Sequence, residues 1–165
     1  MKHKNRETAK RIEEILLENY DRYYRLAYSY TQNEADAQDI VQNGAYKAIL
    51  NSDSLKNAEY AKTWIYRIML NETFTVIKKQ RESSLGEITV EAGQEDVYED
   101  IDLQRALNSM SREDKAVIEL RFFEELKLSE IAEILGENVS TIKSRLYRGL
   151  KKMKLELTDA WQCES

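Results

Sequence analysis

The sequence predicts an all-α protein with two small helical domains joined by an acidic, flexible linker. Proline is absent and glycine occurs only 5 times in 165 residues, a composition that suits helices better than turn-rich β folds. Apolar residues recur at three- and four-residue spacing over two long stretches, as on one face of a helix. Between them the periodicity ends and acidic residues accumulate. The expected domains are residues 5–82 and 100–159, with residues 83–99 as linker.

The first domain is expected to contain three helices. Residues 5–31 form the first, and Asn33 is a plausible N-cap for the second. The polar stretch 51–57 predicts a loop, and a third helix follows over about residues 58–80. The apolar positions of the three helices are Ile12, Ile15, Leu16, Tyr20, Tyr23, Tyr24, Ala27 and Tyr28; Ala37, Ile40, Val41, Ala45, Ala48 and Ile49; and Ala61, Trp64, Ile65, Ile68, Met69 and Phe74.

The second domain is expected to begin with a helix near Asp100. Ser111, followed three residues later by Asp114, nearly matches a capping box and indicates the start of another helix. The core of this part is expected to comprise Leu103, Ala106, Leu107, Met110, Val117, Ile118, Leu120 and Phe122.

The last two helices are expected to form a helix-turn-helix. Ser129 begins the first of them, Gly136 ends it in the turn, and Ser140 caps the second. Ala132 supplies the small residue that the packing point between two steeply crossing helices needs. The residues expected to seal the pair are Ile131, Leu135, Val139, Ile142 and Leu146.

The final helix concentrates positive charge, although the formal net charge of the chain is -5. Its N-terminal part would enter a DNA major groove, where hydroxyl and cationic groups meet base edges or phosphates. Lys151, Lys152 and Lys154 would add attraction to the DNA backbone. The alternative is an amphipathic helix with a solvated basic face. The residues expected on its outer faces or edges are Thr141, Lys143, Ser144, Arg145, Tyr147 and Arg148.

Several functional classes are excluded by composition. His3 is the only histidine and Cys163 the only cysteine, so no metal site, no catalytic triad, no intrachain disulfide and no cofactor are expected. A helical carboxylate metalloprotein would need Glu-x-x-His pairs. No apolar run is long enough for a membrane span, and the N-terminus lacks the apolar core of a secretory signal. We expect a cytoplasmic, non-catalytic protein.

A second basic segment, residues 62–81, interleaves aromatic and cationic side chains. Aromatic rings stack on unpaired bases while cations follow the backbone, so the pattern suits single-stranded or melted DNA. Trp64, Tyr66 and Phe74 are the aromatic residues of this pattern. The alternative is that residues at helical spacing, namely Trp64, Ile65 and Ile68, belong to the core.

Two long segments resemble one family. NYDRYYRLAYSYTQNEADAQDIVQNGAYKA, followed by YAKTWIYRIMLN, is similar to region 2 of the extracytoplasmic-function (ECF) bacterial sigma factors. LNSMSREDKAVIELRFFEELKLSEIAEILGENVSTIKSRLYRGLKKM is similar to their region 4. The resemblance covers about residues 12–82 and 104–155. It implies a specificity factor that binds bacterial core RNA polymerase, recognises two elements of promoter DNA and helps to melt one of them, while catalysis stays with the polymerase.

The resemblance also implies the residues of each contact. Those for core polymerase are Asp36, Asp39, Ile40, Val41 and Gln42, with the apolar members as anchors. Those for the minus-ten element, including a pocket for a flipped base, are Leu55, Lys56, Asn57, Tyr60, Lys62, Trp64, Arg67, Asn71 and Lys78. Those for the minus-thirty-five element are Ser140, Thr141, Lys143, Ser144, Arg145, Tyr147 and Arg148.

The sequence departs from the family pattern at three positions. Asn43 replaces a common acidic residue of the polymerase-binding helix, and Gly44 follows it, although glycine within a helix costs about 1 kcal/mol relative to alanine. Glu72 places negative charge near the expected DNA face, where it either points inward or tunes strand preference.

The family further implies a cognate anti-sigma factor, often membrane-anchored and released by an envelope signal. The acidic linker either occupies the path of nascent RNA or acts as a solvated spacer. The competing function is a helix-turn-helix repressor or activator that works without polymerase, which would need a dimer surface and a palindromic operator.

Overall fold

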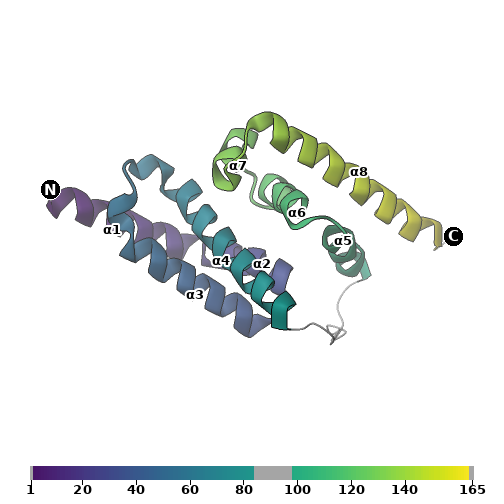
Figure 1. The fold of residues 1–165 in the computed structure, drawn as a ribbon, viewed down its shortest axis with the longest axis horizontal. Coiled ribbons are helices and arrows are strands. Elements are labelled where there is room, and N and C mark those ends of the chain that lie inside the picture. The colour runs from purple at the N-terminus through teal and green to yellow at the C-terminus, as the bar shows by residue number, and fades with distance from the viewer. Residues whose placement is uncertain (1, 84–97, 164–165) are drawn as a thin grey trace. The chain divides into compact units, whose positions relative to one another are not determined.

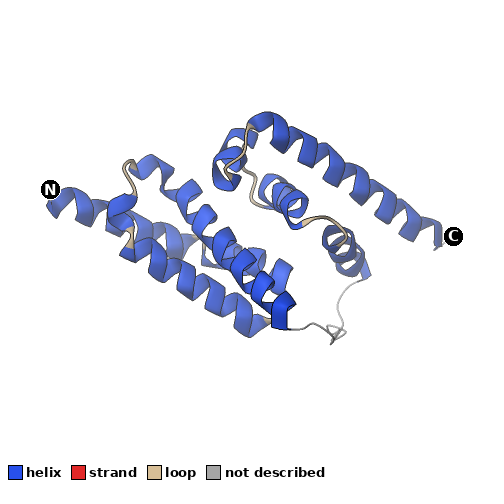
Figure 2. Ribbon diagram, viewed as in Figure 1, coloured by secondary structure: helices blue, strands red, loops and turns tan. Residues whose placement is uncertain are grey.

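The computed structural model describes residues 2–83 and 98–163, with side chains for residues 6–83 and 102–155. The chain divides into two compact units, Met1–Val90 and Glu91–Ser165, coloured purple to teal and green to yellow in Figure 1. The described elements are all helical, as Figure 2 shows, which confirms the all-α prediction. Most of the predicted linker, residues 84–97, lies outside the described residues, and its two ends belong to helices.

The N-terminal unit contains α1 (Lys2–Glu18), α2 (Tyr20–Thr31), α3 (Glu34–Leu50) and α4 (Ala61–Ser83). The prediction of one helix over residues 5–31 is wrong, because the chain breaks at Asn19, where φ is -115° and ψ is 13°. The Asn19 side-chain amide donates to the carbonyl of Ile15 at 2.9 Å and competes there with the backbone N–H, as asparagine commonly does.

The start of α3 follows from its sequence. The side-chain oxygen of Asn33 accepts a hydrogen bond from the N–H of Asp36 at 3.0 Å, which confirms the predicted N-cap. The predicted loop, residues 51–57, contains a short 3-10 turn, Ser52–Ser54, and a second 3-10 turn, Ala58–Tyr60, follows it. The predicted third helix therefore begins as a 3-10 turn and continues as α4 to Ser83.

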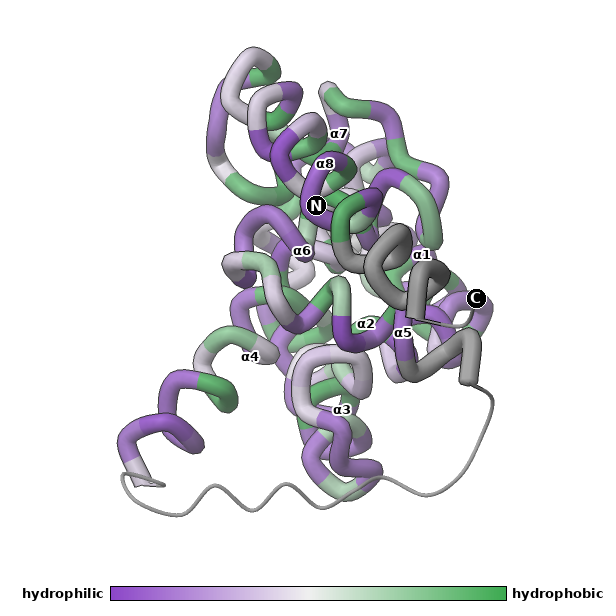
Figure 3. The backbone as a smooth tube through the Cα atoms, turned by 90° about the vertical axis from the view of Figure 1, so that its right-hand side faces the viewer, coloured by the Kyte–Doolittle hydropathy of each residue, from purple (hydrophilic) through white to green (hydrophobic). Residues whose placement is uncertain are grey.

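The core of the N-terminal unit lies between α2, α3 and α4. Tyr23 and Tyr66 are fully buried and meet edge to face, with ring centroids 5.2 Å apart. Gly44 lets α3 approach α4 closely, because a Cβ atom there would lie 2.5 Å from the Met69 sulfur. Glycine at this position is therefore a packing requirement of the α3–α4 contact. Hydrophobic and hydrophilic residues alternate along the turns of α4 (Figure 3), as an amphipathic helix requires.

The C-terminal unit begins with α5 (Tyr98–Asn108) and α6 (Arg112–Ile118), followed by one π-helical turn, Glu119–Phe123. The Ser111 hydroxyl accepts from the N–H of Asp114 at 3.2 Å, which confirms the predicted cap. Phe122 was expected in the core but is 51% exposed, because the π-helical turn moves its side chain out of the stripe that 3.6 residues per turn would give.

The helix-turn-helix consists of α7 (Leu128–Leu135) and α8 (Val139–Cys163). Gly136 ends α7 with a left-handed φ of 67°, as predicted. The cap of α8 is Asn138 and not Ser140, because the Asn138 side-chain oxygen accepts from the N–H of Thr141 at 2.9 Å.

The residues expected to seal the helix-turn-helix differ in burial, and Leu135 and Leu146 are half-buried. Ile131 and Ile142 are fully buried, and Ala132 is buried at the packing point. Val139, the first residue of α8, is the exception, with 38% of its surface exposed. Within the described residues, no helix is long and apolar enough to cross a membrane.

Candidate nucleic-acid interface

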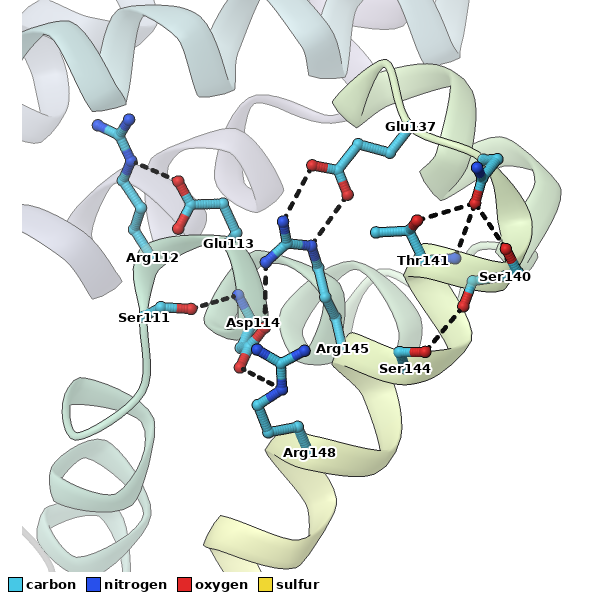
Figure 4. A network of polar contacts seen from close by, with 11 residues as sticks. Ser111, Arg112, Glu113, Asp114, Glu137, Ser140, Thr141, Ser144, Arg145 and Arg148 are labelled. Carbon is cyan, nitrogen blue, oxygen red and sulfur yellow. Dashed lines mark hydrogen bonds and ion pairs between the residues drawn. The ribbon is translucent and has the colours of Figure 1, made fainter.

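The first turns of α8 present hydroxyl groups in a fixed arrangement. Ser140 and Thr141 each donate from the hydroxyl to the Asn138 side-chain oxygen at 2.8 Å. The Ser144 hydroxyl donates to the carbonyl of Ser140 at 3.1 Å (Figure 4). These hydrogen bonds fix the hydroxyl oxygens while Ser140 and Ser144 stay exposed, and each oxygen keeps capacity to accept a further hydrogen bond.

The longer side chains of α8 extend the same surface. Lys143 is exposed, and Tyr147 is 70% exposed. Arg148 is also exposed, and its Nε lies 3.7 Å from a carboxylate oxygen of Asp114. This face therefore offers one cation without a nearby carboxylate among the contacts described, one oriented arginine and one aromatic ring within two turns of helix.

Arg145 is placed differently from its neighbours. Its Nε and Nη2 donate to the two carboxylate oxygens of Glu137 at 2.9 and 3.1 Å, and its Nη1 donates to Asp114 at 3.3 Å (Figure 4). The hydrogen bonds to Glu137 are the main cause that raises the pKa of Arg145 above its ordinary value. The sequence placed Arg145 among the outward residues, and the structure ties it inward.

The basic C-terminal part of α8 is exposed at Lys151, Lys152 and Lys154. The Lys152 ammonium donates to the carbonyl of Ser109, at the C-terminal end of α5. A cation at this end interacts favourably with the helix dipole.

The second basic face lies on α4. At about 3.6 residues per turn, Trp64, Arg67, Asn71 and Lys78 fall on one side of the helix, opposite the side that carries the buried Met69. Arg67, Asn71 and Lys78 are exposed and Trp64 is half-buried, so the structure brings these four predicted residues together. Lys62 is exposed on the first turn but lies on another side of the helix.

Two aromatic residues of the basic segment pack against other rings of the N-terminal unit. Tyr66 is buried against Tyr23, and Phe74 meets Tyr30 edge to face at 5.5 Å. Of the residues that the alternative interpretation named, Ile65 is fully buried, which confirms it there. Trp64 and Ile68 are half-buried.

The loop before α4 holds the remaining minus-ten candidates. Lys56 and Tyr60 are exposed, whereas Leu55 is half-buried. The Asn57 side-chain oxygen accepts from the N–H of Glu59 at 3.0 Å and so shapes the turn. Glu72, whose direction was left open by the sequence, forms an ion pair with Lys47 of α3 and is 12% exposed, so it points inward.

The polymerase-docking candidates on α3 separate by face. Asp39 and Gln42 are exposed, and Asp36 accepts a hydrogen bond from Gln80 at 2.6 Å. Ile40 and Val41 are fully buried. Their predicted role as anchors for a partner is wrong for this structure, because their side chains already fill the core.

Two residues of α3 were missed by the sequence reasoning. Tyr46 is 67% and Leu50 is 63% exposed, and helix geometry places both on the side that carries Asp39 and Gln42. The available signal was their position out of phase with the apolar stripe of Ala37, Ile40, Val41, Ala45, Ala48 and Ile49.

Comparison with known proteins shows which family the chain resembles in sequence and fold. Residues 15–83 match Sigma-70 region 2, and residues 100–153 match Sigma-70, region 4. The sigma factor SigV of Bacillus subtilis is 45% identical over 140 residues, which cover 82% of this chain and 84% of that protein. The ECF sigma factor SigW of the same organism is 29% identical over 158 residues, covering 84% of each chain.

A solved structure shows the same fold. The sigma factor RpoE of Bartonella quintana, crystallised with the anti-sigma factor NepR, superposes with a TM-score of 0.71 at 26% identity, covering 88% of this chain and 96% of that chain. Fold, basic faces and matches together define a transcription initiation factor of the sigma-70 type. More narrowly, the chain belongs to the ECF subfamily of bacterial sigma factors.

Membership confirms the function expected from the resemblance. ECF sigma factors are non-catalytic specificity subunits, which bind core RNA polymerase and direct it to promoter DNA. The repressor and metalloprotein alternatives are therefore set aside.

Proposed function

We propose that this sigma factor directs RNA polymerase to the promoters of a stress or envelope-response regulon. The outer face of α8 reads the minus-thirty-five element, and α4 with its preceding loop holds the melted minus-ten element. The single observation that carries the proposal is the exposed row of Ser140, Lys143, Ser144, Tyr147 and Arg148 on the second helix of the helix-turn-helix, because that helix enters the major groove in proteins of this type.

The minus-ten contacts are proposed for the outer side of α4. Arg67 and Lys78 follow the backbone of the displaced strand, Trp64 stacks on a base, and Asn71 donates to or accepts from a base edge. Leu55, Lys56, Asn57 and Tyr60, in the turn before α4, with Lys62 beside them, border the place of a flipped base. A pocket of this kind offsets the few kcal/mol that extrusion of a base costs.

The polymerase contact is proposed for the outer side of α3. Asp36, Asp39 and Gln42 supply polar contacts, and Tyr46 and Leu50 supply the apolar anchors in place of the buried Ile40 and Val41. Aromatic and aliphatic side chains of this kind, ringed by polar groups, commonly dominate the binding energy of protein interfaces.

Regulation by an anti-sigma factor is proposed by analogy with relatives. The Bartonella quintana structure contains a sigma factor bound to its anti-sigma factor. We propose that this chain acts in the cytoplasm and is held by a cognate, membrane-anchored anti-sigma factor until an envelope signal releases it.

The proposed function is tested by run-off transcription. The purified chain is added to sigma-free core polymerase with fragmented DNA from the source genome, and the transcripts are sequenced. We expect discrete start sites that share two upstream elements and whose genes encode envelope functions. Transcripts without a shared upstream element, or from genes unrelated to the envelope, would contradict the corresponding part of the proposal.

The docking face is tested by a matched pair of leucines. Leu50→Ala is expected to weaken binding to core polymerase about tenfold or more, as loss of an interface anchor does. Leu17→Ala removes a leucine of α1 that is also exposed and is expected to leave binding unchanged. Binding is measured by fluorescence anisotropy of labelled chain titrated with core polymerase. Equal effects of the two substitutions would place the interface elsewhere.

A further inference from the structure

The guanidinium of Arg145 is enclosed by carboxylates of its own domain. The Nε–Nη2 edge faces both oxygens of Glu137, and Nη1 reaches Oδ1 of Asp114. A paired contact of this type matches the geometry by which arginine would otherwise bind a phosphate or a guanine. The edge that could read DNA is therefore already used.

Burial separates Arg145 from the arginine one turn later. The Arg145 side chain is 21% exposed, and that of Arg148 is 64% exposed. Asp114 is 6% exposed and contacts both: its Oδ1 accepts from Arg145 at 3.3 Å, and its Oδ2 lies 3.7 Å from Arg148. Asp114 thus binds the half-buried Arg145 and lies within ion-pair distance of the exposed Arg148.

The three segments joined by Arg145 define how α8 is held. Asp114 lies in the first turn of α6, Glu137 follows Gly136 in the turn of the helix-turn-helix, and Arg145 lies on α8. If Arg145 turned toward DNA, the buried Asp114 carboxylate would lose a partner, at a substantial free-energy cost. The carboxylates of Asp114 and Glu137 would also lose the guanidinium that neutralises them while a polyanion binds beside them.

We propose that Arg145 is a positioning residue and not a DNA contact. It fixes α8 against α6 and the turn, neutralises Asp114 and Glu137 next to the DNA, and leaves Asp114 to orient Arg148 toward the minus-thirty-five element. This inference refines the proposed function of α8, on which it rests, and it assigns base and phosphate contacts to the exposed residues Lys143, Ser144, Tyr147 and Arg148.

The salt dependence of DNA binding distinguishes a residue that contacts a phosphate from a residue that only positions α8. Full-length chain is titrated with a labelled random-sequence duplex of about two helical turns over a range of KCl concentrations. A residue that neutralises a phosphate contributes about 0.9 to the slope of log K against log salt. We expect Lys143→Gln to lower the slope by about that amount and Arg145→Gln to leave it unchanged. Equal slopes for the two variants would overturn the inference.

Removal of Glu137 supplies a second test that does not depend on the stability of an Arg145 variant. Glu137→Gln frees one edge of the guanidinium. If Arg145 were a restrained DNA contact, this variant would bind the duplex with a slope steeper by about 0.9. We expect no steepening beyond that of Glu133→Gln, which neutralises an exposed carboxylate of α7 in the same unit.

Thermal unfolding tests the supporting role directly. We expect Arg145→Lys to destabilise the C-terminal unit almost as much as Arg145→Gln, because an ammonium cannot pair with two carboxylates through a planar fork. We also expect the double variant Arg145→Gln/Glu137→Gln to lose less than the sum of the single losses. Additive losses, or full rescue by lysine, would contradict the proposal.

These measurements separate the inference from the proposed function. The random duplex and the unfolding experiments need neither a promoter nor polymerase. A chain that yields no promoter-specific transcripts would overturn the proposed function, while the salt slopes and the coupling between Arg145 and Glu137 would still decide the role of Arg145.

Discussion

The two helical units of the chain bury different kinds of side chain. In the described part of the N-terminal unit the buried polar residue is Thr73, whose hydroxyl donates to the carbonyl of Met69 at 2.7 Å. The C-terminal unit buries charged residues, namely Asp114, Lys115, Glu119 and Glu124. The first unit is thus stabilised mainly by apolar packing. The second is also stabilised by charged groups, whose contribution to the free energy of unfolding depends on their partners and on pH.

The difference corresponds to what each unit is proposed to bind. Apolar packing behind α4 keeps its outer cations available for a single strand that adopts many conformations. Buried carboxylates behind α8 hold the reading helix in one orientation, which a regular major groove requires. Among the described residues, buried charge therefore lies in the unit proposed to bind duplex DNA.

The largest expected effect tests the apolar unit. Ile40→Ala removes a fully buried side chain of α3 and is expected to lower the free energy of unfolding of the N-terminal unit by about 3 kcal/mol. Urea denaturation gives the value, and hydrogen exchange assigns it to a unit. Asp39→Asn, on the exposed side of α3, is the control. Equal destabilisation of both units by Ile40→Ala would break the comparison.

The next effect tests the charged unit through pH. Burial lowers the pKa of Lys115 from 10.5 to about 8, although Glu119 acts in the opposite direction. Between these pKa values the unfolded chain binds more protons than the folded chain, so the stability of the C-terminal unit rises with pH. From about pH 7 to about pH 9.5 we expect a gain of about 2 kcal/mol.

Substitution of the lysine checks the origin of this gain. Lys115→Met is expected to abolish the rise between neutral and alkaline pH, because methionine carries no titrating group. Lys151→Met, which changes an exposed lysine of α8, is expected to retain it. Unfolding by urea at several pH values measures both. A rise that persists in Lys115→Met would assign it to another group.

A smaller effect compares the glycines that bring helices together in each unit. A Cβ atom on Gly149 would lie 2.8 Å from Cγ1 of Ile118, and one on Gly44 would lie 2.5 Å from the sulfur of Met69. Isoleucine is stiff and methionine adapts. We therefore expect Gly149→Ala to destabilise its unit by about 1.5 kcal/mol and Gly44→Ala by about half as much.

A second substitution sharpens the test at Gly44. In a Met69→Ala background the clash is absent, so Gly44→Ala is expected to stabilise α3 by up to about 1 kcal/mol through helix propensity. Thermal unfolding of the four members of this cycle gives the result. Destabilisation that persists in the Met69→Ala background would show that another contact restricts position 44.

The smallest effect concerns a charge pair on the surface of the apolar unit. Arg11 and Glu14 approach to 3.4 Å on α1, with side chains 52% and 47% exposed. Arg11→Gln is expected to change the stability by about 0.3 kcal/mol or less. Urea denaturation at low and high salt measures it. A loss above about 1 kcal/mol would indicate that surface charge stabilises this unit after all.

Local sequence signals predicted the parts of the fold that depend on neighbouring residues. The caps at Asn33 and Ser111 and the left-handed Gly136 follow from side chains within three residues. The break at Asn19 was missed, since its competing hydrogen bond does not disturb the apolar stripe. Periodicity also misplaced Phe122, because a π-helical turn changes the period.

The sequence predicted which residue types lie on which helix face of the candidate site. It predicted less well which side chains contact one another. The exposed row on α8 and the outer side of α4 follow from helical periodicity. The inward position of Arg145 does not, because its partner Asp114 lies 31 residues away in sequence. Only the tertiary structure shows which cations of a basic helix are bound by the protein itself.

The contacts of Asp114, Glu137 and Arg145 have a consequence for protein engineering. A recognition helix is often treated as a cassette that carries promoter specificity between regulators. Here the orientation of the cassette is encoded partly in α6 and in the turn. A chimera that receives α8 alone would carry its side chains without the contacts that orient the helix. A chimera that also receives the residues at positions 114 and 137 would carry both.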